Sequence, residues 1–168
     1  GLSEDEYLEV IRRKTAVLFE AACRVSAVLA DAPEDQESVL ADYGFNLGMA
    51  FQMADDLFDY LLETPQLGKE IGADLREGKM TLPLIHALRN ARSADRKWMA
   101  GVIQNKDFSG EDFQKLVGLL TGYGAFRSTE KAAGRFIEKA KAALDAFGPS
   151  ETRQTMLDIA DYTLQRRV

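Results

Sequence analysis

The chain has 168 residues, 46% of them hydrophobic, which is enough for one domain with a sizeable core and excludes a disordered chain. The net charge is −6, with 27 acidic against 21 basic residues and no basic block, so nucleic acid is disfavoured as a partner. The single cysteine, Cys23, excludes an internal disulfide and is expected to be a buried residue in a reducing compartment. The sequence shows no signal peptide and no apolar run that could span a bilayer, and the predicted location is cytoplasmic.

A first helix is predicted from Ser3 to about Ala30. Ser3 and Glu6 have the spacing of a capping box, in which each side chain accepts a backbone N–H of the other residue. Apolar residues then recur at helical spacing, at Tyr7, Ile11, Leu18, Ala22 and Val25. Lys14 and Thr15 lie beside this stripe. Taken alone, Lys14 is typical of a surface lysine, and Thr15 of a residue that bonds a backbone carbonyl.

A turn at residues 32–35 precedes a central helix, expected from about Glu37 to Leu62. At about 100° per residue, four polar side chains fall within one arc of this helix, namely Gln52, Asp55, Asp56 and Asp59. The other faces are apolar, so the helix is expected to be buried. Gly44 and Gly48 each cost up to ~1 kcal/mol in a helix interior. Close approach of another helix, a bulky substrate, or plain tolerance would each account for them.

The acidic arc predicts a metal site. Three clustered carboxylates on a buried helix repel one another and lose hydration, so they require a cation or must protonate. An acidic helix face is usually a solvated surface, but the apolar flanks and the absence of basic residues four positions away argue against that here. We interpret this face as the lining of a wet cavity that holds divalent metal.

The segment from Glu63 to Met80 is predicted to be a loop that approaches an anion. It contains three glycines that allow unusual backbone angles, Gly68, Gly72 and Gly78. Two of them directly precede lysines, Lys69 and Lys79. Backbone N–H groups and an ammonium that point one way suit a diphosphate. Metal on the aspartates and lysines on the loop would hold the same anion from two sides.

Five further helices are expected, over about 81–91, 93–104, 109–120, 125–147 and from 150 onward. Thr81 is the predicted N-cap of the first of these, with Pro83 in its first turn, and Ser109 is the predicted cap of the third. His86 is interpreted as structural, because no His or Cys partner lies near it in the sequence. No strand-like alternation occurs, so the fold class is all-α.

With these residues in order, the sequence resembles the C-terminal part of the trans-type isoprenyl diphosphate synthases, the family of farnesyl, geranylgeranyl and longer polyprenyl diphosphate synthases. The resemblance covers essentially the whole chain. It rests on four motifs: Lys14-Thr15-Ala16, Gly48-x-x-x-Gln52-x-x-Asp55-Asp56-x-x-Asp59, Gly68-Lys69-x-x-Gly72-x-Asp74-Leu75 and Gly78-Lys79-x-Thr81-Leu82-Pro83. Residues 76–84 are most similar to the bacterial long-chain branch, such as octaprenyl diphosphate synthase. The resemblance implies one all-α domain over residues 1–168, with the acidic helix surrounded by the others.

The resemblance also implies roles for individual residues. Asp55 is similar to the direct ligand of a Mg²⁺ that binds the allylic diphosphate. Its motif also contains Asp56 and Asp59, and Asp59 and Asp74 are expected to act through metal-bound water. Contacts to the diphosphate are implied for three lysines, Lys14, Lys69 and Lys79. The implied catalytic set is Lys14, Thr15 and Gln52, and the last two would lie beside the carbon that becomes a cation. These roles replace the first interpretation of Lys14 and Thr15.

Full-length members of this family are longer and carry a first aspartate-rich motif upstream, together with the residues that bind isopentenyl diphosphate. No second Asp-Asp-x-x-Asp occurs in this sequence, which begins at Gly1. We therefore expect a C-terminal fragment of a prenyltransferase that is inactive alone, with bare apolar surface that favours self-association. For the full-length parent the resemblance implies a homodimer, and a long-chain product that would bring it to the membrane periphery.

Two alternatives stay open. A non-catalytic partner subunit of a heteromeric prenyl synthase would share these features, although such subunits usually lose the second aspartate motif, which is intact here. A terpene cyclase-like enzyme shares the helical fold but has a different metal signature and lacks the Gly-Lys segments. An assay of isopentenyl transfer by the chain alone and with candidate partners distinguishes the synthase fragment from the partner subunit.

Overall fold

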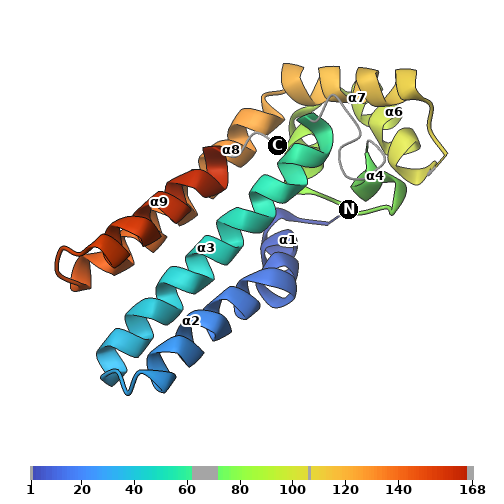
Figure 1. Ribbon diagram of the computed structural model, residues 1–168. Helices are drawn as coiled ribbons and strands as arrows, with labels where there is room; N and C mark the ends of the chain where they lie inside the picture. The colour runs from blue at the N-terminus through green and yellow to red at the C-terminus, as the bar shows by residue number, and fades with distance from the viewer. Residues whose placement is uncertain (1, 62–71, 106, 166–168) are drawn as a thin grey trace. The chain divides into compact units, whose positions relative to one another are not determined.

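The computed structural model describes residues 2–61, 72–105 and 107–165, and every regular element within these ranges is helical (Figure 1). In chain order the elements are α1 (Glu4–Ile11), the π-helical turn η1 (Arg12–Ala16), α2 (Val17–Leu29), α3 (Glu34–Leu61), α4 (Ala73–Arg76), α5 (Leu82–Asn90), α6 (Ser93–Gln104), α7 (Gly110–Gly122), α8 (Ala125–Ala143), the 3₁₀ turn η2 (Leu144–Ala146) and α9 (Glu151–Gln165). The all-α prediction is confirmed. Within the described ranges, no helix is both long and apolar enough to cross a bilayer.

The chain forms two compact units. Unit 1 comprises Gly1–Tyr7 with Asp55–Thr129, and unit 2 comprises Leu8–Ala54 with Glu130–Val168. Each unit is made from two separate parts of the sequence. Because compact units can belong to one folding domain, the expectation of a single domain over residues 1–168 stays a prediction.

The predicted first helix has the expected extent but not the expected regularity. Its capping box is present: the Ser3 N–H donates to Glu6 Oε2 at 2.7 Å, and the Glu6 N–H donates to Ser3 Oγ at 3.2 Å. The helix is then interrupted by η1, a π-helical turn that contains Lys14 and Thr15. Such turns occur frequently at functional sites, and the residue types of this segment did not predict one.

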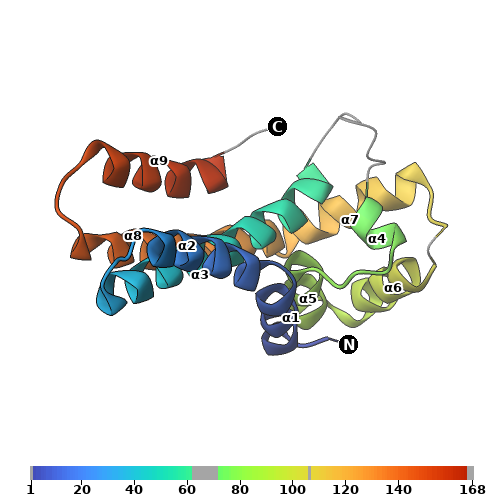
Figure 2. The same ribbon diagram turned by 60° about the horizontal axis from the view of Figure 1, so that its bottom comes forward.

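In unit 2, α2 lies beside α3 because two glycines let the backbones approach (Figures 1 and 2). A Cβ at Gly44 would lie 2.5 Å from the Phe19 carbonyl oxygen, and a Cβ at Gly48 would lie 2.7 Å from the Ala16 Cα. Of the explanations that the sequence left open for these glycines, close approach of another helix is therefore confirmed.

The core of unit 2 is completed by α8 and by α9, which turns back along α8 (Figure 1). Its buried members are Tyr43, Leu47, Ala50, Ile137, Ala140, Leu144 and Ala160. The Lys141 ammonium donates to Asp161 Oδ1 at 2.9 Å and joins the two helices at the edge of the core. Cys23 packs against this cluster but is only half-buried, so the prediction of a buried cysteine was too strong.

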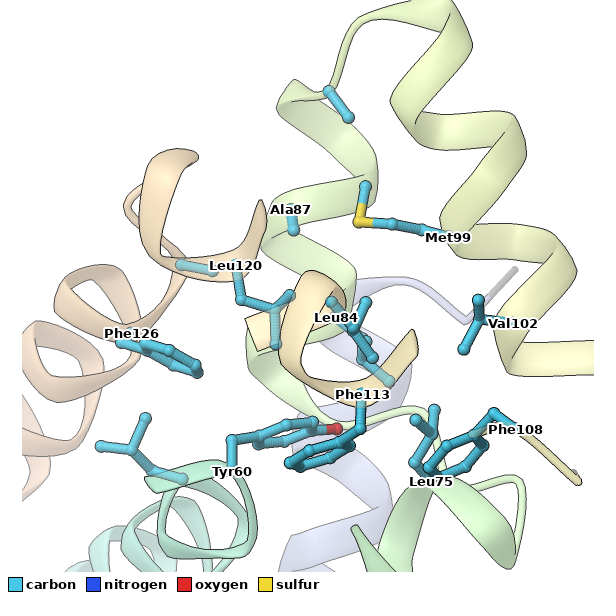
Figure 3. Packing of buried hydrophobic residues seen from close by; sticks show 14 residues of the cluster. Tyr60, Leu75, Leu84, Ala87, Met99, Val102, Phe108, Phe113, Leu120 and Phe126 are labelled. Atoms are coloured by element: carbon cyan, nitrogen blue, oxygen red, sulfur yellow. The ribbon is translucent and has the colours of Figure 1, made fainter. Parts of the chain in front are cut away.

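The core of unit 1 is rich in aromatic rings (Figure 3). Phe113 on α7 stacks on Tyr60 of α3, with ring centroids 6.2 Å apart, and on Phe108 at 6.0 Å. Gly72 is in the left-handed region at φ 72°, and a Cβ there would lie 2.6 Å from the Phe113 ring. This core therefore fixes both the end of α3 and the chain that leads into α4. At the start of α7, Ser109 forms the predicted cap.

Candidate functional site

The acidic motif occupies the last turns of α3. Asp56 is 6% exposed, and Asp55 and Asp59 are half-buried. The apolar neighbours on both sides of the motif are buried, namely Met53, Ala54, Leu57 and Tyr60. The sequence-based expectation of a buried helix with polar groups on one arc therefore agrees with the structure.

Asp56 is bonded to a residue that the sequence analysis counted only as part of an apolar stripe. The Tyr7 hydroxyl donates to Asp56 Oδ2 at 2.7 Å, inside unit 1. Burial, and then the negative charge of Asp56, raises the pKa of Tyr7 above its ordinary value. A tyrosine on a buried stripe needs a partner for its O–H, and this requirement is the one sequence signal that Tyr7 has a polar contact, although it does not identify Asp56 as the partner.

Asp59 is linked to the segment that follows the predicted loop. The Asp74 backbone N–H donates to Asp59 Oδ2 at 3.2 Å, and the Lys79 ammonium donates to Asp74 Oδ1 at 2.6 Å. Hydrogen bonds from Lys79 to Asp74 and then to Glu77 raise the pKa of Lys79. The structure thus brings Asp59, Asp74 and Lys79 together, as the metal-and-lysine hypothesis requires.

The glycines of this segment have the predicted backbone freedom where they are described. Gly72 has φ 72° and Gly78 has φ 79°. The positive φ at Gly78 accompanies a return of the chain, in which the Lys79 N–H donates to the Asp74 carbonyl at 2.9 Å. Gly68 and Lys69, the other predicted Gly-Lys pair, lie outside the described residues.

Thr81 is the N-cap of α5 by position, but its side chain makes no capping hydrogen bond. Its hydroxyl instead pairs with the Tyr60 hydroxyl at 2.7 Å, and both groups are buried. The predicted capping role of the side chain is therefore wrong. The physical reason is that the buried Tyr60 hydroxyl, next to the motif, needs a hydrogen-bond partner. A Thr81 side chain that capped the helix toward solvent would not provide one.

Two residues of the predicted catalytic set, Thr15 and Gln52, are brought together within unit 2. The Thr15 hydroxyl donates to Gln52 Oε1 at 2.7 Å, and Gln52 is 6% exposed. Thr15 lies in η1, so the backbone carbonyl bond expected for an isolated mid-helix threonine is replaced by this side-chain bond. Lys14 precedes it in η1 and is exposed.

The donor atoms of the site suit a hard divalent cation. They are carboxylate oxygens, which Mg²⁺ prefers, and Asp55 and Asp59 are separated by one helical turn. Among the described residues, no three His, Cys, Asp or Glu side chains converge on a preformed metal cage. Mg²⁺ is usually bound by one or two carboxylates together with substrate phosphates, so the residues present fit an ion shared with a diphosphate.

His86 does not join these groups in the part of the chain that the structure describes. It is buried, with Nδ1 at 3.3 Å from the Arg89 guanidinium, and the Ser128 hydroxyl lies 3.4 Å from its ring nitrogens. The Asn90 amide donates to its carbonyl oxygen at 3.0 Å. These contacts agree with the structural role expected from the sequence.

The helical fold, with its motif-bearing helices α3 and η1, defines an all-α protein of the isoprenyl synthase fold. The sequence matches the polyprenyl synthetase family over residues 1–120, and the chain belongs to that family. The resemblance drawn from the four motifs is therefore confirmed.

Individual relatives match over almost the whole chain. The octaprenyl diphosphate synthase of Escherichia coli (strain K12) is 36% identical over 98% of this chain and 51% of that protein. The octaprenyl diphosphate synthase of Haemophilus influenzae is 38% identical over 98% of this chain and 50% of that protein. A crystal structure of a polyprenyl synthase from Caulobacter crescentus CB15, complexed with calcium and isoprenyl diphosphate, is 40% identical, with a TM-score of 0.94 over 100% of this chain and 51% of that one. The chain thus spans about half the length of the relatives it matches.

Proposed function

We propose that this chain is the C-terminal portion of a polyprenyl diphosphate synthase, a prenyltransferase that condenses isopentenyl diphosphate with an allylic diphosphate. The observation that carries the proposal is the meeting of Asp59, Asp74 and Lys79, because an aspartate-rich helix and a glycine–lysine segment converge there. Membership of the polyprenyl synthetase family supports it. So does the Caulobacter polyprenyl synthase that is complexed with calcium and isoprenyl diphosphate.

The second aspartate-rich motif is proposed to hold Mg²⁺, with Asp55 as a direct ligand. Asp59 and Asp74 would act through metal-bound water, and Asp56 completes the motif. Bound there, Mg²⁺ would neutralise the charge that develops on the departing diphosphate. Lys79, already on Asp74, would add positive charge to the same anion, and Lys14 and Lys69 are proposed as further diphosphate contacts.

Thr15 and Gln52 are proposed to stabilise the allylic carbon as it becomes a cation. Because the Thr15 hydroxyl directs its proton to Gln52, the lone pairs of the Thr15 oxygen point away from that bond. Oxygen lone pairs stabilise a neighbouring positive charge. Apolar side chains around the site would exclude the water that quenches such a cation.

The 168 residues are proposed to be inactive alone, because they contain one aspartate-rich motif and prenyl transfer in this family uses two. Isopentenyl diphosphate would bind mainly through upstream residues of the parent protein. A homodimer, and peripheral association with the membrane through a long-chain product, are proposed for that parent. The alternative of a non-catalytic partner subunit is less well supported, since the motif on α3 is intact.

A radiolabelled isopentenyl transfer assay tests this proposal. The chain is assayed alone, with the separately produced N-terminal half of a similar synthase, and with candidate subunits that lack both aspartate motifs. We expect no transfer by the chain alone and transfer with the N-terminal half. Transfer by the chain alone would contradict the proposed inactivity, and rescue only by an unrelated subunit would favour the partner-subunit alternative.

A further inference from the structure

Tyr7 on α1 has a buried hydroxyl that contacts the acidic motif directly. Its Oη atom donates to Asp56 Oδ2 at 2.7 Å, across 49 residues of sequence. Tyr7 is 3% exposed and Asp56 is 6% exposed, so water competes little for either group. A hydrogen bond from a buried hydroxyl to a carboxylate is strong and directional in such surroundings. The Asp56 carboxylate is therefore held in one orientation.

We propose that Tyr7 is a positioning residue for the metal site, which acts through Asp56 on the turn of α3 that presents Asp55 and Asp59. Asp55 directly precedes Asp56, and Asp59 follows it within one helical turn, so a shift of Asp56 displaces both. Hydrogen-bond partners of metal-site carboxylates typically contribute about 10–100-fold to metal affinity. The inference rests on the proposed function, because it assumes that this motif binds Mg²⁺ with a diphosphate.

A purely structural role for Tyr7 makes a different prediction, and Tyr43 offers the matched control. Tyr43 is also 3% exposed, and its hydroxyl donates to the Met156 carbonyl oxygen at 2.9 Å. The substitutions Tyr7→Phe and Tyr43→Phe each remove one hydroxyl and keep the ring. Tyr43 bonds a backbone carbonyl of α9, within unit 2, and not a residue of the acidic motif. A general loss of stability would therefore appear in both variants, whereas a loss of metal affinity would appear in one.

The experiment is a calorimetric titration of Mg²⁺ into the chain in the presence of inorganic diphosphate, with circular dichroism to verify folding. We expect Tyr7→Phe to bind Mg²⁺ about tenfold more weakly than the wild type, and Tyr43→Phe to bind it as the wild type does. Asp56→Ala is a second variant, which removes the acceptor of the Tyr7 hydrogen bond, and we expect it to lose affinity as well. In the Asp56→Ala background, Tyr7→Phe should cause no further loss, because Tyr7 acts through Asp56.

Wild-type affinity in Tyr7→Phe would overturn the inference, and so would an equal loss of affinity in Tyr43→Phe. An undiminished effect of Tyr7→Phe in the Asp56→Ala background would overturn the inference, because Tyr7 would then act by another route. If Tyr7→Phe does not fold, wild-type affinity in Asp56→Ala overturns the inference by itself. Failure of the wild-type chain to bind Mg²⁺ and diphosphate together is a different result, because it overturns the proposed function and the inference with it.

Discussion

Replacement of Gly48 by alanine tests the close approach of α2 to α3, which also holds Thr15 beside Gln52. The added Cβ would lie 2.7 Å from the Ala16 Cα and 3.0 Å from the Phe19 Cβ. The nearer atom belongs to the backbone and cannot rotate away, so the two helices must separate. Because Ala16 directly follows Thr15, this separation should weaken the hydrogen bond from Thr15 to Gln52.

The magnitude follows from two opposing effects. Alanine in place of glycine stabilises a helix interior by up to ~1 kcal/mol. Overpacking against a neighbouring helix costs about 1–3 kcal/mol. Gly134 on α8 is the matched control, since a Cβ there would meet no atom within 4 Å. Gly134→Ala gains the helix propensity without the clash, so the two variants should differ in stability by about 1–3 kcal/mol.

Thermal unfolding followed by circular dichroism measures this difference. For a chain of this size, each 1 kcal/mol shifts Tm by about 2–4 °C, so Gly48→Ala should melt roughly 2–12 °C below Gly134→Ala. We expect Gly134→Ala to melt at or above the wild-type temperature. If Gly48→Ala is stabilised as much as Gly134→Ala, the close packing of these backbones is wrong and the account of the glycine pair must be abandoned.

Three further outcomes are expected. Phe113→Ala should lower the free energy of unfolding by about 3–5 kcal/mol, because the Phe113 ring stacks on two others in the core of unit 1. A loss under about 1 kcal/mol in denaturant melts would contradict that packing. Ser109→Ala removes the capping box of α7 and should lower the free energy of unfolding by about 1 kcal/mol. Ser93→Ala, one residue past the N-cap of α6, should lower it much less. Equal losses in the two variants would refute the capping assignment. Hydrogen bonds from the backbone and then the side chain of Ser3 lower the pKa of Glu6 from its ordinary 4.5. The stability from this cap is therefore present above about pH 4.5 and is lost as the pH falls through the lowered pKa. An NMR titration of Glu6 with an unshifted midpoint would contradict this.

Local chemistry made much of the fold predictable. The capping boxes of Ser3 and Ser109 involve residues three positions apart, so the sequence alone fixes both partners. The extent of α3 followed from an uninterrupted apolar segment without proline. The acidic arc was visible for the same reason, since helical periodicity determines which side chains share a face.

The missed features depend on tertiary packing. A π-helical turn such as η1 depends on how the helix packs, and Lys14 and Thr15 give no local sign of it. The hydroxyls of Tyr7 and Tyr60 have hydrogen-bond partners 49 and 21 residues away, and spacing within one helix cannot identify such partners. The capping role predicted for Thr81 failed for the same reason.

The central claim is that the acidic end of α3 binds Mg²⁺ together with a diphosphate, and calorimetry on Asp55→Ala tests it most directly. Asp42→Ala is the control, because Asp42 is an exposed aspartate near the start of the same helix. We predict that Asp55→Ala weakens the Mg²⁺-dependent binding of inorganic diphosphate by more than about tenfold, while Asp42→Ala leaves it unchanged. Wild-type affinity in Asp55→Ala would contradict the account.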